Sequence, residues 1–238
     1  MRSFVLAIDC GNSRLKWGVH ADGAWTRKDS VPLGRIVGLE QHWSGLGQPK
    51  RVVVSNVAGE AVGREIAKLL AHWGIEPVWV RPKSSECGVT NGYAHPEQLG
   101  SDRWAALIGA RALHPGPALV IDAGTATTAD MLTAAGAFAG GVILPGVELM
   151  KRALAQHAAQ LPLAEGRYRD QPRDTADAIE TGCLLAQAGA IERLHSNMEP
   201  GAQCLITGGD AARVAATLRI PARVVDNLVL EGLLRIAG

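Results

Sequence analysis

The fold of this chain follows from residues 6–16, which read Leu6-Ala7-Ile8-Asp9-Cys10-Gly11-Asn12-Ser13-Arg14-Leu15-Lys16. An apolar run ending at Ile8 predicts a buried strand, and alternation over residues 14–19 predicts a second strand running back. The tip of this hairpin suits a polyphosphate carrying a divalent ion, with Lys16 and backbone N–H groups at the phosphate oxygens and Asp9 at the metal or its waters. Considered alone, the same residues fit equally well a plain turn that favours Gly, Asn and Asp.

A second stretch repeats this pattern in the other half of the chain, Ala118-Leu119-Val120-Ile121-Asp122-Ala123-Gly124-Thr125-Ala126-Thr127-Thr128. Asp9 aligns with Asp122, and Gly11 aligns with Gly124. Two phosphate-type hairpins at equivalent places predict a duplicated α/β fold, with mixed sheets flanked by helices and a ligand held between the halves. This arrangement resembles the actin, sugar kinase and Hsp70 superfamily, whose domains are ribonuclease H-like.

Domain boundaries follow from the duplication and from turn-forming residues. The run His114-Pro115-Gly116-Pro117 predicts the join. We therefore expect an N-terminal domain over residues 1–114 with the first hairpin, and a C-terminal domain over residues 115–238 with the second. The longest expected helix spans Ala176–Met198, and a closing helix over residues 228–236 is assigned to the second domain.

Composition argues against several other classes of protein. The 238 residues are 47% hydrophobic and 20% charged, with a net charge of +1 and no basic block, so nucleic acid is not an expected partner. No basic-then-apolar leader opens the chain, and the longest uncharged stretch is shorter than the roughly 20 apolar residues of a membrane helix. The four cysteines lie far apart and form no CxxC, which favours a reducing cytoplasm and no zinc site.

The run Gly100-Ser101-Asp102-Arg103 precedes an apolar-periodic helix expected over residues 104–113. Ser101 or Asp102 can act as the N-cap of that helix. Alternatively, Asp102 can act as a general base, with Arg103 beside it to bind an anionic group through two hydrogen bonds. The two roles of Asp102 are compatible.

The run Gly208-Gly209-Asp210 follows a predicted strand and opens a predicted helix. Glycines there let a flat ring or a phosphate approach the backbone, and a helix N-terminus attracts anions. The alternative is a plain turn with Asp210 as N-cap. In the duplicated frame this loop falls where adenosine lies. Because the GxxxxGK[ST] phosphate loop is absent, the nucleotide interpretation depends on the paired hairpins.

Five motifs in order resemble those of the type III pantothenate kinases. They comprise residues 9–16, 100–103 and 121–130, Gly140-Gly141 with Pro145-Gly146, and Asp174-Thr175 with Ala178-Ile179 and Gly182. The sequence departs from the family pattern at two positions. Ser13 stands where Thr is more frequent and keeps the hydroxyl, whereas Asp174 replaces the usual Asn and exchanges an amide for an acid.

The resemblance implies an actin-like fold that binds ATP with Mg²⁺ in the cleft between the domains. It implies transfer of the γ-phosphoryl group to the primary hydroxyl of pantothenate, the first step of coenzyme A synthesis. Asp102 is then the base, and Asp122 holds a monovalent cation, potassium or ammonium. The implied ATP and phosphate contacts are Asp9, Cys10, Gly11, Asn12, Ser13, Arg14, Leu15, Lys16 and Thr125. The implied pantothenate contacts are Tyr93, Gly100, Ser101, Asp102, Arg103 and Thr175.

The same resemblance implies a homodimer in which Thr175 reaches pantothenate across the interface. The helix expected over Ala176–Met198 is apolar enough to need cover on more than one face, which its own sheet or a second copy can supply. Two alternative functions remain: an ATP-dependent transcriptional accessory protein of the same family, and an actin-like phosphotransferase or phosphatase with another acceptor. Retention of Asp102 and Arg103 favours catalysis, because a regulator needs no base.

Overall fold

A computed structural model describes residues 3–158, 161, 163 and 165–238. The chain forms two compact units, Met1–His114 with Asn227–Gly238, and Pro115–Asp226. The C-terminal helix α7 (Leu228–Ala237) therefore belongs to the first unit, whereas the sequence pattern assigned it to the second. Close packing against α3 (Ser101–Leu113) explains this difference, since a Cβ on Gly232 would overlap the Ala105 carbonyl group and one on Gly109 would overlap that of Leu228.

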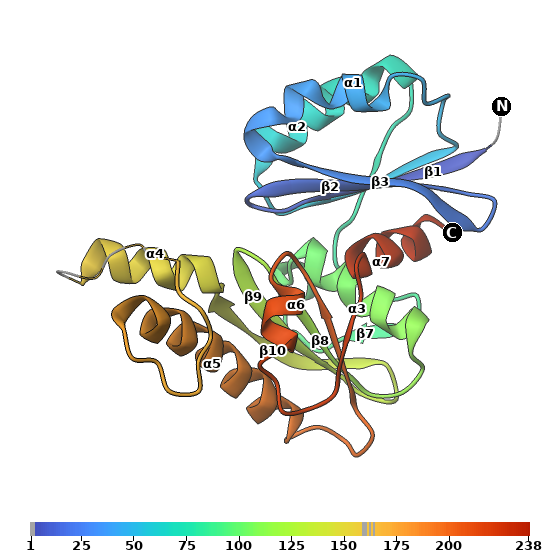
Figure 1. Cartoon of the computed structure of the whole chain (residues 1–238). Helices are drawn as coiled ribbons and strands as arrows, with labels where there is room; N and C mark the ends of the chain where they lie inside the picture. Colours follow the sequence, from blue (N-terminus) through green and yellow to red (C-terminus); the bar gives the residue numbers. More distant parts are fainter. Residues whose placement is uncertain (1–2, 159–160, 162, 164) are drawn as a thin grey trace. The chain divides into compact units, whose positions relative to one another are not determined.

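The first unit is built on a sheet of strand order β3-β2-β1-β4-β5. Its elements are β1 (Phe4–Cys10), β2 (Arg14–Ala21), β3 (Ala24–Pro32), β4 (Arg51–Asn56), β5 (Val78–Trp79), α1 (Leu39–Trp43), α2 (Glu60–Leu70), α3 and α7, with short 3₁₀ turns at Leu33–Gly38, Ala71–Trp73 and Pro96–Gln98. Helices α1 and α2 cover one face of the sheet, and α3 and α7 pack on the other (Figure 1). A short hairpin, β6 (Ser85–Glu86) and β7 (Val89–Asn91), precedes α3.

Tryptophans fill the core between the sheet and the α1–α2 layer. Trp17 on β2 and Trp43 on α1 meet edge to face with ring centroids 6.1 Å apart, and Trp73 lies 5.7 Å from Trp43. Such aromatic pairs bury a large apolar area in a defined geometry. This packing holds β1 and β2 rigid behind the turn that joins them.

The second unit repeats the plan with strands in the order β12-β11-β8-β9-β10. Its elements are β8 (Ala118–Ala123), β9 (Ala126–Leu132), β10 (Ala137–Pro145), β11 (Gln203–Thr207), β12 (Ala222–Val224), α4 (Val147–His157), α5 (Thr175–His195) and α6 (Ala211–Ala215). Helices α5 and α6 lie beside this sheet (Figure 1), and their apolar side chains share a core cluster with those of β8 and β11. In both units an antiparallel hairpin, β1–β2 or β8–β9, lies beside a parallel strand, β4 or β11. The predicted duplication is therefore visible in the strand pairing.

Two helix ends differ from the expected ranges. The helix expected to end at Met198 ends at His195, where turns continue the chain. The sequence pattern also predicts a helix over residues 147–160; in the structure this helix ends at His157, and residues 159 and 160 lie outside the described part of the chain. Within the described residues, no helix has both the length and the apolar character that crossing a membrane requires.

Candidate active site

The first hairpin has the geometry predicted for residues 6–16. Asp9 pairs with Lys16 in the β1–β2 register, and a hydrogen bond from Gly11 N to Arg14 O, 3.1 Å long, closes the turn. Asn12 and Ser13 are exposed at its tip, whereas the Asp9 side chain is buried. The tip therefore presents backbone and small polar groups to solvent above a buried carboxylate.

Three residues of the predicted phosphate turn have side chains that are directed elsewhere. Arg14 donates to Ser30 on β3, with Nη2 2.8 Å from the hydroxyl oxygen and 3.1 Å from the carbonyl oxygen. Leu15 is fully buried in the core, which leaves only its backbone for a ligand. Burial also raises the pKa of the Cys10 thiol far above its ordinary value, so the thiol stays protonated and unreactive.

A buried hydroxyl pair links the first hairpin to the start of α3. Ser55 lies opposite Asp9 in the parallel β1–β4 register. Its Oγ is 2.9 Å from the Oγ of Ser101, the first residue of α3, and both side chains are buried. Asp9 and residues 100–103 therefore lie on neighbouring elements of the first unit. Ser55 lies near the end of β4, and nothing in the sequence indicated its partner.

Asp102 does not cap α3, which corrects one interpretation of the sequence. The helix begins at Ser101 with Gly100 as N-cap, and no side chain makes a capping hydrogen bond. Asp102 instead accepts a hydrogen bond from its neighbour, with Oδ1 2.8 Å from Arg103 N. A Cβ on Gly100 would lie 2.5 Å from that oxygen, so glycine leaves room for the carboxylate. Burial raises the pKa of Asp102, and the Arg103 amide and charge offset only part of the shift.

The side chains of Arg103 and Tyr93 pair with each other beside Asp102. The Arg103 guanidinium is buried, donates from Nη1 to the Tyr93 hydroxyl at 3.0 Å, and lies 5.8 Å from the centre of the ring. Asn91, which the sequence analysis did not single out, shapes the loop that carries Tyr93. It accepts a hydrogen bond from Tyr93 N at 3.0 Å and donates to Pro96 O at 3.2 Å. The buried Asn91 side chain thus stabilises this loop through two hydrogen bonds to its backbone.

In the second unit, the predicted site residues lie around the second hairpin. Asp122 is the second-last residue of β8, and the exposed Thr125 follows in the turn, where its carbonyl oxygen accepts from Gly146 N at 3.0 Å. Gly208 has φ +103°, and a Cβ there would lie 2.5 Å from Asp122 Oδ1. Asp210 N donates to Ala123 O at 2.9 Å. The hairpin turn, the start of α4 and the predicted adenosine loop therefore meet in one unit.

Asp210 occupies the N-cap position of α6, as the alternative interpretation of the loop expected. Its side chain makes no capping hydrogen bond there. The carboxylate instead faces Arg213, with Oδ1 3.6 Å from Nη1. Burial raises the pKa of Asp210, and the Arg213 charge opposes that rise.

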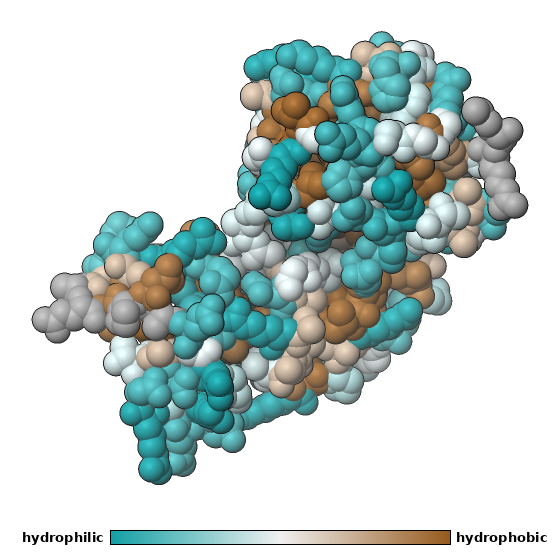
Figure 2. Space-filling model, turned by 45° about the horizontal axis from the view of Figure 1, so that its top comes forward, coloured by the Kyte–Doolittle hydropathy of each residue, from teal (hydrophilic) through white to brown (hydrophobic). Residues whose placement is uncertain are grey.

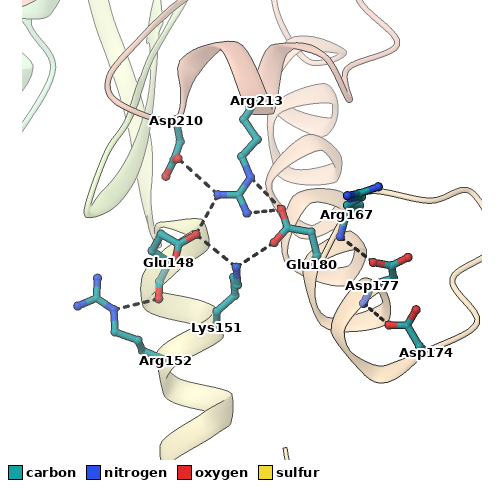
Figure 3. A network of polar contacts seen from close by, with 9 residues as sticks. All are labelled: Glu148, Lys151, Arg152, Arg167, Asp174, Asp177, Glu180, Asp210 and Arg213. Atoms are coloured by element: carbon teal, nitrogen blue, oxygen red, sulfur yellow. Dashed lines mark hydrogen bonds and ion pairs between the residues drawn. The ribbon is translucent and has the colours of Figure 1, made fainter. Parts of the chain in front are cut away.

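Asp174, the departure from the family pattern, is the N-cap of α5. Its Oδ1 accepts from Asp177 N at 2.8 Å, a bond that an Asn side-chain oxygen could also make. The Asp177 carboxylate in turn accepts from Arg167 N at 2.7 Å, which fixes the preceding segment on the helix (Figure 3). Helix capping is thus preserved with Asp at this position.

Thr175 lies on the wall of an apolar groove of about 1090 Å³ between α4 and α5. The groove is lined mainly by Leu149, Met150, Leu154, Ala178, Ile179 and Cys183. Figure 2 shows apolar surface among hydrophilic residues on this unit. Among the described residues, no cluster of three His, Cys, Asp or Glu side chains could hold a metal ion.

Comparison with known proteins gives the fold and the family. The family model for type III pantothenate kinase matches residues 5–197. The type III pantothenate kinase of Aromatoleum aromaticum is 50% identical over 235 residues, which cover 98% of this chain and 97% of that protein.

Solved structures with much lower identity share the fold. A protein described as a Baf family transcriptional activator, from Campylobacter jejuni, matches with a TM-score of 0.63 at 20% identity, over 97% of this chain and 96% of its own. A protein described as a 2-dehydro-3-deoxygalactonokinase, from Sinorhizobium meliloti, also gives 0.63, at 16% identity and 97% coverage of both chains. The predicted actin-like, sugar kinase fold is confirmed. With its family model matched over most of its length, the chain belongs to the type III pantothenate kinase family.

Proposed function

We propose that this chain carries out the reaction of its family with Asp102 as the catalytic base. The family reaction is the ATP-dependent phosphorylation of pantothenate to 4'-phosphopantothenate, the first step of coenzyme A biosynthesis. The observation that carries the assignment is the environment of Asp102. Its carboxylate is held beside the Arg103–Tyr93 pair and is not used as a helix cap.

The acceptor hydroxyl is a weak nucleophile at neutral pH, so a positioned carboxylate that accepts its proton assists attack on the γ-phosphate. Burial raises the pKa of Asp102 and so makes it a stronger proton acceptor than a surface carboxylate. Arg103 offers a buried, planar set of donors that fits the carboxylate of pantothenate through two hydrogen bonds. Tyr93, whose hydroxyl is bonded to Arg103, then borders the same substrate.

Phosphoryl transfer depends mainly on charge neutralisation and alignment. We assign the phosphate contacts to the turn between β1 and β2, where Lys16 and the backbone N–H of Asn12 would neutralise charge, and where Asp9 would hold the Mg²⁺ of the ATP substrate. In the second unit we assign ATP contact to Thr125 and to the loop Gly208-Gly209-Asp210.

The surroundings of Asp122 fit a monovalent cation. Asp122 is the second-last residue of β8, and its carboxylate lies close to the backbone of Gly208. Oxygen ligands of this kind suit a hard cation, which would supply positive charge near the phosphates. We expect activity to be low in sodium and to rise with potassium or ammonium. Equal rates in sodium and potassium would remove this role from Asp122.

We further propose that the enzyme acts as a homodimer in the cytoplasm. The apolar groove between α4 and α5 supports a second copy as its cover, with Thr175 on the groove wall available to the partner's pantothenate site. The four free thiols are compatible with a reducing compartment.

A coupled ADP-release assay tests the proposed activity. With MgATP and potassium present, ADP release should require pantothenate. Release that is unchanged by omitting pantothenate would point to another acceptor or to a regulatory ATPase. Parallel assays with other primary alcohols that carry a carboxylate would then identify the acceptor class.

A further inference from the structure

Five charged side chains in the second unit form a connected network (Figure 3). Arg213 on α6 is its centre. Its Nε lies 2.8 Å from Glu180 Oε1, and its Nη2 pairs with the same oxygen. Its Nη1 lies 2.9 Å from Glu148 Oε1 and 3.6 Å from Asp210 Oδ1. Lys151 completes the network, with Nζ 3.0 Å from Glu180 Oε2 and 3.5 Å from Glu148 Oε1.

The inner part of this network is withdrawn from solvent. The side chains of Glu180 and Lys151 are only 4% and 6% exposed. Removing charges from water is costly, and well-packed apolar residues of similar volume are often at least as stabilising. Stability alone is therefore a weak reason for an ion-pair network at this position. A role in fixing a particular geometry fits it better.

The residues of this network lie on α4, α5 and α6, close in sequence to the proposed site residues of the second unit. Glu148 and Lys151 lie on α4, which starts directly after Gly146, the residue bonded to the Thr125 carbonyl. Glu180 lies on α5. Arg213 lies on α6 and faces Asp210, the last residue of the loop that follows β11.

Asp210 is the one residue of the loop Gly208-Gly209-Asp210 that has a side chain to define the loop's conformation. Gly208 adopts φ +103°, a conformation that glycine enters without steric cost, and Gly209 adds no side chain. A flexible dipeptide of this kind must be ordered by its flanks. Both contacts at the following flank belong to Asp210: its N–H bonds to Ala123 O, and its carboxylate pairs with Arg213.

We propose that Arg213 is a positioning residue for ATP. It braces Asp210 against the buried carboxylate of Glu180 and so holds the loop Gly208-Gly209-Asp210 in the shape that receives the adenosine. The inference rests on the proposed placement of ATP at this loop. It adds a residue that touches no substrate and lies outside every motif of the sequence analysis.

The test is the binding of a non-hydrolysable ATP analogue to Arg213→Met, measured without pantothenate and without turnover. We expect the Kd of the analogue and the KM for ATP to rise about five- to twentyfold, with the KM for pantothenate within about twofold of wild type. Arg152→Met is the matched control, because Arg152 is an exposed arginine that donates only to the Glu148 carbonyl oxygen, at 3.2 Å, in the network drawn. It should leave all three constants unchanged.

A double-mutant cycle with Asp210→Asn asks whether Arg213 acts through Asp210. Non-additive losses of analogue affinity support that path, since residues in one network couple. If Arg213→Met does not fold, Arg213→Lys takes its place, because Lys keeps the positive charge but lacks the planar guanidinium. Arg213→Lys should raise the Kd of the analogue and the KM for ATP by a smaller factor, with the KM for pantothenate again within about twofold of wild type.

Two outcomes overturn the proposal. One is a lower melting temperature with unchanged constants for ATP and its analogue, which leaves a purely structural role. The other is an equal rise in the KM values for both substrates, which indicates general distortion. Failure of the proposed catalytic function is distinguishable, because it appears in turnover by wild type and Asp102→Asn and not in analogue binding.

Discussion

At the residue scale, the behaviour of Asp102 follows from its burial. The half-buried carboxylate has lost part of its hydration, and the neighbouring amide and guanidinium of Arg103 do not fully replace it, so its pKa lies above the ordinary aspartate value. A group with a raised folded-state pKa favours the protonated form on folding. Its ionisation therefore reduces the stability of the protein as pH rises through the folded pKa.

The raised pKa of Asp102 gives a prediction for the pH dependence of kcat/KM. The base must be ionised to act, so the acidic limb of kcat/KM should have its midpoint above about 3.9, the ordinary aspartate pKa. The corresponding limb should vanish in Asp102→Asn, whose residual activity has no carboxylate to titrate at that position. A wild-type limb that persists unchanged in the variant would assign the titration to another group.

At the scale of secondary-structure elements, close backbone packing is clearest between α3 and α7. Gly232 and Gly109 let the two helices approach until backbone groups touch. Because α3 also carries Ser101, Asp102 and Arg103, α7 supports the helix on which the proposed base lies. If Asp102 is the base, the C-terminal helix is part of the frame that orients it.

Gly232→Ala should lower the stability of the protein by about 1–3 kcal/mol, because the added methyl group must displace the Ala105 backbone. Gly189→Ala is the matched control, since Gly189 lies inside α5 with open space at its Cβ position. That variant should gain roughly 0.5–1 kcal/mol from helix propensity. Chemical denaturation of both variants measures the difference, and equal stabilities would refute the tight α3–α7 contact.

At the scale of the whole molecule, the proposed homodimer depends on the apolar groove between α4 and α5. Leu154 lines the groove with 37% of its surface exposed, whereas Leu185 is 50% exposed on α5 outside it. Both are apolar residues on helix surfaces, so they make a matched pair for a charge substitution.

Leu154→Asp should weaken the dimer at least about a hundredfold, on the order of 3 kcal/mol, because a carboxylate would be buried in an apolar interface. Activity should fall with the dimer if Thr175 serves the partner's site. Leu185→Asp should leave both mass and activity near wild type. Light scattering at micromolar concentration measures the mass, and a fully active wild-type monomer would end the dimer account.

The sequence predicted those features that depend on local patterns. The Asp9 and Asp122 hairpins were predicted correctly, because strand alternation and turn residues determine them over about ten positions. The position of α7 was not predictable, since it depends on contact between Gly232 and Ala105, far apart in the chain. The same holds for the Arg213–Glu180 pair, which joins residues from separate helices. The cap at Gly100 depends on the loop before α3, whose residues have no periodic pattern.

The central claim is that Asp102 serves as the base in pantothenate phosphorylation, and the kcat of Asp102→Asn tests it most directly. The substitution keeps the size of the side chain and the oxygen that accepts from Arg103 N, and α3 does not depend on Asp102 as a cap. We predict that kcat falls by roughly 10²–10⁴, or about 3–5 kcal/mol, while binding of an ATP analogue stays at the wild-type level and the melting temperature is equal or slightly higher. A variant that keeps kcat within a few-fold of wild type would contradict the account and place the base elsewhere.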